Sequence, residues 1–189
     1  MNRRRFLLGS AGVTATAFGG PWLGTAAAAT DDDLAFANFG VSTEFLLKEF
    51  YERALAAKQF GTHRANVLRH GRLAATNHAK ALSKLLVSFG DAPPLEEDFE
   101  FAWPKRAFAA PPQTVRTGRV ILGALLGTYQ TAAASSSVID YRTLYASLAA
   151  SVGEQSASVA ALSSPVGAKS FPAAMDVETA SARLEAYLG

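Results

Sequence analysis

The residues after position 30 repeat the hydrophobic and polar spacing of α-helices. Residues 31–58 are strong helix formers without proline, and the aspartates at 31–33 suit an N-cap and the positive end of a helix dipole. Gly61 breaks the pattern, and residues 64–89 repeat it until a glycine and two prolines end it. Because the link between these two segments is short, they are predicted to form an antiparallel pair.

Residues 90–112 hold five prolines, an acidic run and interspersed aromatic residues, which predicts a crossover held on the helices by its aromatic side chains. Further helices are predicted over 114–134 and 139–162, and a short last helix is capped by Asp176. The connections are short, long and short, as in a bundle with one crossover. The predicted fold class is therefore all-α: a four-helix bundle with a long crossover between its second and third helices and a short C-terminal helix.

The composition limits the chain to one domain with one core. It has 189 residues, of which 49% are hydrophobic and 18% charged, and no cysteine. A disulfide-stapled module, a thiolate zinc site, an iron–sulfur protein and a disordered tail are excluded. Residues 120–134 are uncharged, but Arg116 and Arg119 leave an apolar stretch well below the ~18 residues of a membrane-spanning helix. The glycines of this helix lack the Lys-Ser or Lys-Thr of a phosphate loop and are expected to allow close packing: Gly118, Gly123 and Gly127.

The first 29 residues have the features of a signal peptide, which leaves residues 30–189 as the folded domain. A cluster of three arginines at 3–5 precedes a mildly apolar stretch, and four alanines at 26–29 suit a signal peptidase. The arginines followed by Phe6 and Leu7 resemble a twin-arginine export signal, and the alternative is an ordinary secretory signal. Either signal predicts a periplasmic, cell-envelope or extracellular location.

Export also changes the charge balance. The full chain carries a net charge of +2, but removal of three arginines and no acidic residue leaves 15 basic against 16 acidic residues, a net charge of −1. The basic isoelectric point therefore belongs to the precursor, and nucleic-acid binding is not predicted.

Two residues on the first helix pair are candidates for chemistry. At 100° per residue, His78 lies on the apolar face of its helix, whereas His63 and His70 lie to one side of it. Glu44 shares the apolar face of the first helix with Tyr51, seven residues later, and needs a partner if it is buried. A buried Glu and His on neighbouring helices can form a metal-free pair, a pair linked by water, or part of a metal site.

The chain resembles the ferritin-like family of exported bacterial proteins, which is related to desiccation-associated plant proteins. The resemblance runs from Asn-Phe-Gly-Val-Ser-Thr-Glu-Phe-Leu at 38–46, with Phe50 and Tyr51, through Phe-Glu-Phe at 99–101 to Phe-Pro at 171–172. It implies two helix pairs that each offer a Glu from one helix and a Glu-x-x-His from the next, together holding two metal ions.

The resemblance carries only part of this ligand set onto the chain. Glu44 matches the first Glu and His78 the first His, but the Glu expected three residues before His78 is Ala75. Tyr129 aligns with Tyr51, which puts Leu122 at the position of the second Glu.

In the last helix, Glu154 matches the Glu of the final motif, and Ala157 stands at its His position. Three of the six implied ligands are absent, too few for two divalent ions. The vestigial metal ligands predicted here are Glu44, His78 and Glu154, although Glu154 lies ~120° from the apolar stripe of its helix.

The third and fourth helices carry few charges. From Thr143 to Ala168 the only charged residue is Glu154, and small residues dominate. This surface is either a neutral alanine- and serine-rich surface or a contact with a second copy or another protein.

Three functional hypotheses follow. The first is a non-enzymatic, exported ferritin-like protein with a degenerate di-metal site and no cofactor, acting in binding or protection or as a structural protein. The second is a metal-handling or redox protein that binds a single iron or manganese ion through Glu44 and His78, assisted by His70 or Glu154. The third is a homo-oligomer or scaffold that associates through the third and fourth helices.

Overall fold

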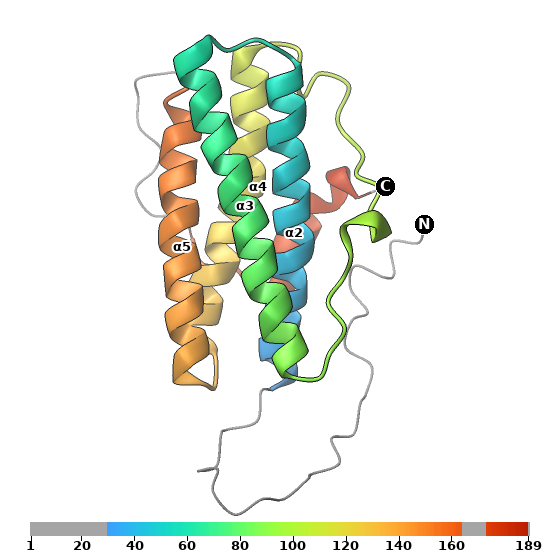
Figure 1. Ribbon diagram of the computed structural model, residues 1–189, viewed down its shortest axis with the longest axis vertical. Coiled ribbons are helices and arrows are strands. Elements are labelled where there is room, and N and C mark those ends of the chain that lie inside the picture. The colour runs from blue at the N-terminus through green and yellow to red at the C-terminus, as the bar shows by residue number, and fades with distance from the viewer. Residues whose placement is uncertain (1–29, 164–172, 189) are drawn as a thin grey trace, which may run out of the picture.

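The computed structural model describes residues 30–163 and 173–188. The proposed signal peptide at 1–29 and the Phe-Pro pair at 171–172 lie outside the described residues. Five α-helices occur in the described part of the chain: α2 (Asp31–Ala56), α3 (Thr62–Ser88), α4 (Pro111–Ser135), α5 (Ile139–Ala160) and α6 (Val177–Leu184). Short 3-10 turns, η1 (Glu96–Asp98) and η2 (Glu185–Tyr187), complete the regular structure. The four long helices stand side by side and α6 packs against α4 and α2, which confirms the predicted fold class (Figure 1).

The predicted helix ends differ from the observed ones by only a few residues. The N-cap of α2 is Thr30 rather than one of the aspartates, because Thr30 and Asp33 exchange hydrogen bonds in a capping box. Helix α4 begins at Pro111, earlier than predicted, because proline suits the first helical position, where no amide hydrogen is needed.

The crossover from α3 to α4 packs onto the bundle through its aromatic residues, as predicted. Trp103 and Phe108 both pack against Phe50 of α2, with ring centroids 6.5 and 6.0 Å from it. The indole nitrogen of Trp103 donates to Glu49, 2.9 Å away. These contacts hold a long irregular segment across one side of the bundle (Figure 1).

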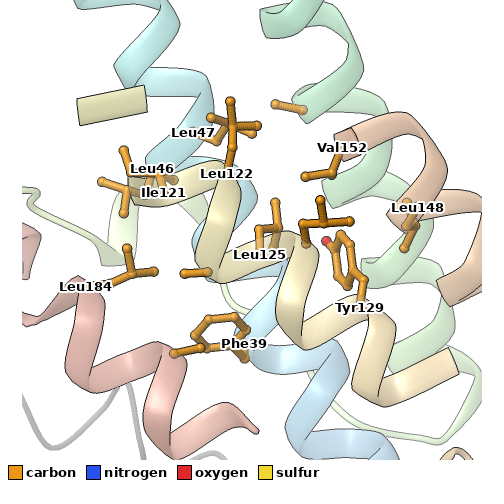
Figure 2. Close-up of a cluster of buried hydrophobic side chains, with 14 of the residues drawn as sticks. Phe39, Leu46, Leu47, Ile121, Leu122, Leu125, Tyr129, Leu148, Val152 and Leu184 are labelled. Atoms are coloured by element: carbon orange, nitrogen blue, oxygen red, sulfur yellow. The ribbon is translucent and has the colours of Figure 1, made fainter. Parts of the chain in front are cut away.

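Helix α4 lies at the centre of the core, where α2, α5 and α6 pack against it. Figure 2 shows Leu122, Leu125 and Tyr129 of this helix within the cluster of buried side chains. Its lack of charge therefore results from burial within the chain's own core. No helix in the described residues is long and apolar enough to cross a membrane.

Two of the three glycines on α4 allow close packing, as predicted. A Cβ at Gly118 would lie 2.6 Å from the ring of Phe50, and one at Gly127 would lie 2.7 Å from the carbonyl oxygen of Ala173. Gly123 has no neighbour within 4 Å of such a Cβ, so packing does not explain it.

Candidate functional site

The polar centre of the bundle is built on Glu44 of α2. Its side chain is completely buried, and its Oε1 lies 2.9 Å from Nδ1 of His78 on α3. The hydroxyl of Tyr129 on α4 donates to the same oxygen, also at 2.9 Å. The predicted inward orientation of Glu44 and His78 is confirmed, and a third helix completes the cluster.

The environment of Glu44 favours its neutral form. Burial raises the pKa of the carboxyl group above its ordinary value, and the contacts with His78 and Tyr129 oppose that rise. The second carboxyl oxygen, Oε2, has no hydrogen-bond partner in the described part of the chain. A buried carboxylate with one oxygen that accepts no hydrogen bond is unfavourable. The Glu44 carboxyl group therefore keeps its proton to a higher pH than an exposed glutamate does.

A second buried tyrosine, Tyr51, makes a hydrogen bond between α2 and α5. The hydroxyl of Tyr51 on α2 donates to Oε1 of Gln155 on α5, 2.9 Å away. Burial and the nearby Glu44 carboxyl raise the pKa of both Tyr51 and Tyr129, so both hydroxyls stay protonated and can donate. The helices form two pairs, α2 with α3 and α4 with α5, and each tyrosine donates to a polar residue of the pair to which it does not belong.

The spacing of inward-facing residues gives the register of α5 relative to α3. On α3 these residues follow intervals of three, four, three and four: Leu68, Gly71, Ala75, His78 and Leu82. On α5 the intervals are the same: Tyr145, Leu148, Val152, Gln155 and Val159. Among the matches that this repeat allows, the one nearest the predicted alignment pairs Val152 with Ala75 and Gln155 with His78.

This register differs from the alignment predicted for the last helix. Gln155 is buried, whereas Glu154 and Ala157 are exposed on α5. The α2–α4 part of the alignment fits the structure, because Ala75 and Leu122 are both fully buried on the inner faces of their helices. The corrected positions of the second Glu-x-x-His motif are thus Val152 and Gln155.

The structure brings only two of the three predicted ligands together. Glu44 and His78 are in contact, whereas Glu154 lines a separate pocket between α3 and α5, together with His70. His63 and His70 are both exposed. The sequence reasoning missed Tyr129 and Gln155 as polar residues of the centre, although a Gln within an apolar stripe was a usable signal.

The donors at this centre do not fit a pair of metal ions. A di-metal site in such a bundle needs carboxylates from all four helices, and the structure has Ala75, Leu122 and Val152 at three of those positions. Within residues 30–163 and 173–188, no three His, Asp or Glu side chains are grouped so that they could hold a metal ion. What the cluster offers is one carboxyl group, one imidazole and one phenol.

Comparison with known proteins agrees with the architecture. Residues 32–165 match the sequence model of the ferritin-like domain, and this region covers the four long helices except for the first residue of α2. No curated protein shows significant sequence similarity to the chain.

Proposed function

The chain belongs to the ferritin-like domain family, and we propose that it is an exported member that has lost the paired metal centre. On this proposal the protein acts outside the cytoplasmic membrane in binding or protection, and it is not an enzyme. Export is supported by the twin-arginine pattern followed by an apolar stretch and a run of alanines.

The observation that carries the proposal is the apolar filling of the ligand positions. Leu122 is fully buried where the second helix pair would supply a carboxylate, and Val152 is fully buried where that pair would supply another. Apolar side chains at these positions pack the core and supply no electron pair to an ion. The remaining polar groups hydrogen-bond to one another across the bundle.

Metal analysis of protein exported by its own signal tests this proposal. We expect clearly less than one iron or manganese ion per chain, measured by elemental analysis together with protein mass. Glu44→Gln is the matched control, since it keeps the size of the side chain and removes the carboxylate. One ion per chain in the unaltered protein that disappears in Glu44→Gln would contradict the loss of the centre.

A single-ion site is the second candidate, and one observation favours it. Oε2 of Glu44 is buried without a hydrogen-bond partner in the described residues, and Nδ1 of His78 lies 2.9 Å from the other carboxyl oxygen. A carboxylate and an imidazole are suitable ligands for iron or manganese. Titration with Mn²⁺ or Fe²⁺ tests this candidate, with His78→Gln expected to abolish binding and Glu154→Gln showing whether that residue assists.

Self-association is a further part of the proposal, through the exposed small residues of α5. Ser147, Ala150 and Ala157 are exposed on this helix, while the uncharged part of α4 is largely inside the core. The expected interface is therefore formed by α5 alone and not by both α4 and α5. Light scattering at several concentrations measures the mass of the protein in solution. A strictly monomeric mass that Ala150→Glu leaves unchanged would exclude association through this face.

A further inference from the structure

A pocket of about 570 Å³ lies where α4 packs against α6, and neither Glu44 nor His78 lines it. Three of its lining residues are arginines: Arg116 and Arg119 of α4 and Arg183 of α6. Most of the others are apolar: Pro112, Val115 and Val120. No acidic residue lines the pocket within the described part of the chain. The pocket therefore combines several cationic groups with apolar surface.

The two arginines of α4 occupy the one exposed face of the first half of that helix. Arg116 and Arg119 are three positions apart, so they lie on the same side of the helix. Between residues 111 and 123 only they and Pro112 are exposed, while the other positions are buried or half-buried. Both side chains are therefore accessible to a ligand from the same direction.

Helix α6 is held against α4 at both of its ends. Just before the helix, the amide of Met175 donates to the carbonyl oxygen of Gly127, 3.0 Å away. In its last turn, Leu184 is fully buried, and Figure 2 shows it within the cluster of side chains around α4. Arg183 precedes Leu184 directly, so the core packing fixes the backbone that carries the third arginine.

The three arginines have no counter-charge within the chain. Within residues 30–163 and 173–188, none of them makes a hydrogen bond or an ion pair with another residue. The sequence contains no Asp or Glu between residues 111 and 135 or between residues 155 and 175. Neither α4 nor the segment that leads from α5 to α6 therefore supplies an anion. Because like charges at one pocket repel, a bound anion would relieve an unfavourable arrangement.

The chemistry of arginine indicates which anion suits this pocket. The planar guanidinium group forms paired hydrogen bonds with phosphate oxygens. A phosphate monoester carries a charge of about −1.5 to −2 at pH 7 and has three acceptor oxygens, so it can engage several arginines at once. The pocket also has room for an organic group, for which the buried Val115 and the half-buried Val120 offer apolar surface.

We propose that the pocket between α4 and α6 binds a ligand that carries a phosphate group on a small organic group. The phosphate oxygens accept from Arg116, Arg119 and Arg183. The organic group packs on Val115 and Val120. The proposal does not depend on whether an ion binds at Glu44, because metal content and phosphate binding involve different residues and are measured separately.

Calorimetric titration of the full chain with phenyl phosphate at low ionic strength tests the proposal. Saturable binding of one molecule per chain is expected, and phenol, which lacks the phosphate group, should not bind. The double variant Arg119→Gln/Arg183→Gln removes one guanidinium group from each helix and should weaken phenyl phosphate binding by at least about tenfold. Arg64→Gln/Lys84→Gln changes the net charge equally at exposed positions of α3 and should leave the affinity unchanged.

A free phosphate ester and the headgroup of a phospholipid share this chemistry. Sedimentation with phosphatidylcholine vesicles that contain phosphatidic acid separates the two sources. Vesicle binding that is lost in Arg119→Gln/Arg183→Gln would identify the headgroup, and binding of phenyl phosphate without vesicle binding would identify the free ester.

All four substituted residues are exposed, so both double variants test binding without altering the core. The proposal is overturned if neither phenyl phosphate in the millimolar range nor the vesicles bind. It is equally overturned if binding survives Arg119→Gln/Arg183→Gln. An equal loss of affinity in the two double variants would also overturn it, since attraction would then depend on net charge and not on this pocket.

Discussion

Glu44→Gln is expected to change how the stability of the protein depends on pH. Burial raises the pKa of Glu44 in the folded state, whereas the unfolded chain has the ordinary value of 4.5. Between these two values the folded protein keeps a proton that the unfolded chain has released. The protonated Glu44 therefore makes its full contribution to the free energy of unfolding below pH 4.5. This contribution is lost as the pH rises from 4.5 through the raised pKa.

The slope of this loss follows from proton linkage. One proton bound by the folded state and not by the unfolded state lowers the free energy of unfolding by ~1.4 kcal/mol per pH unit. Glutamine is neutral at every pH, and its carbonyl oxygen can still accept from Tyr129. Glu44→Gln should therefore gain stability relative to the unaltered protein as the pH rises from 4.5, by about that slope until the raised pKa is reached.

Urea denaturation followed by circular dichroism at several pH values between 4.5 and 8 measures the effect. For each protein the free energy of unfolding is plotted against pH. Other ionisable groups, including His78, are present in both proteins, so the difference between the two curves is the effect of Glu44 and of its coupling to those groups. Glu97→Gln, at an exposed position of the crossover, is the control and should give a curve parallel to that of the unaltered protein. If the Glu44→Gln curve is also parallel, the carboxyl group has no raised pKa and the reasoning fails.

Three further substitutions are predicted to change the stability of the fold, one at a hydrogen bond of this centre and two at glycines. Tyr129→Phe removes a hydrogen bond to the buried Glu44 carboxyl group and should lower the free energy of unfolding by about 1–3 kcal/mol at neutral pH. Urea denaturation measures this change, and an unchanged free energy of unfolding would show that the hydroxyl contributes nothing to stability. Gly71→Ala forces a methyl group against the ring of Tyr51 and should destabilise the fold by about 1–3 kcal/mol. Gly123→Ala, with open space around the added Cβ, should instead stabilise it by about 0.5–1 kcal/mol, and equal effects at the two glycines in thermal melts would refute the packing argument.

The helices and their order could be predicted because the signals are local. Gly90, with φ of 80°, and the two prolines that follow it end α3 through backbone sterics that do not depend on the rest of the fold, whereas α2 ends at Ala56 and Gly61 stands at the start of α3. The inward orientation of Glu44 and His78 follows equally from helical periodicity. Figure 1 shows the long connection between α3 and α4, the segment that contains the prolines, running beside α2.

The register of α5 could not be predicted in the same way. Alanine and serine, which contrast little with apolar residues, make up much of its exposed face, so its hydrophobic stripe is weak in the sequence. Tyr145 and Val152, which are fully buried, define the stripe once the bundle is assembled. Glu154 then lies outside, and its neutral neighbour Gln155 lies inside.

The contacts of the tyrosines were beyond sequence reasoning because they join residues distant in the chain. Tyr129 reaches Glu44 across 85 positions, and Tyr51 reaches Gln155 across 104. Neither pairing is implied by the period of a single helix. They depend on how the two helix pairs face each other, which is set by the packing of the whole core.

These two contacts also give the polar residues of the centre a structural role that needs no metal. A tyrosine hydroxyl buried at the middle of a bundle is unfavourable without a hydrogen-bond partner, and both rings here are fully buried. Glu44 accepts from the tyrosine of the other helix pair, and so does Gln155. Each helix pair therefore supplies one donor and one acceptor to the other. Glu44 is consequently required for packing even in a chain whose remaining ligand positions are apolar, since replacing it alone with an apolar residue would leave Tyr129 unpaired.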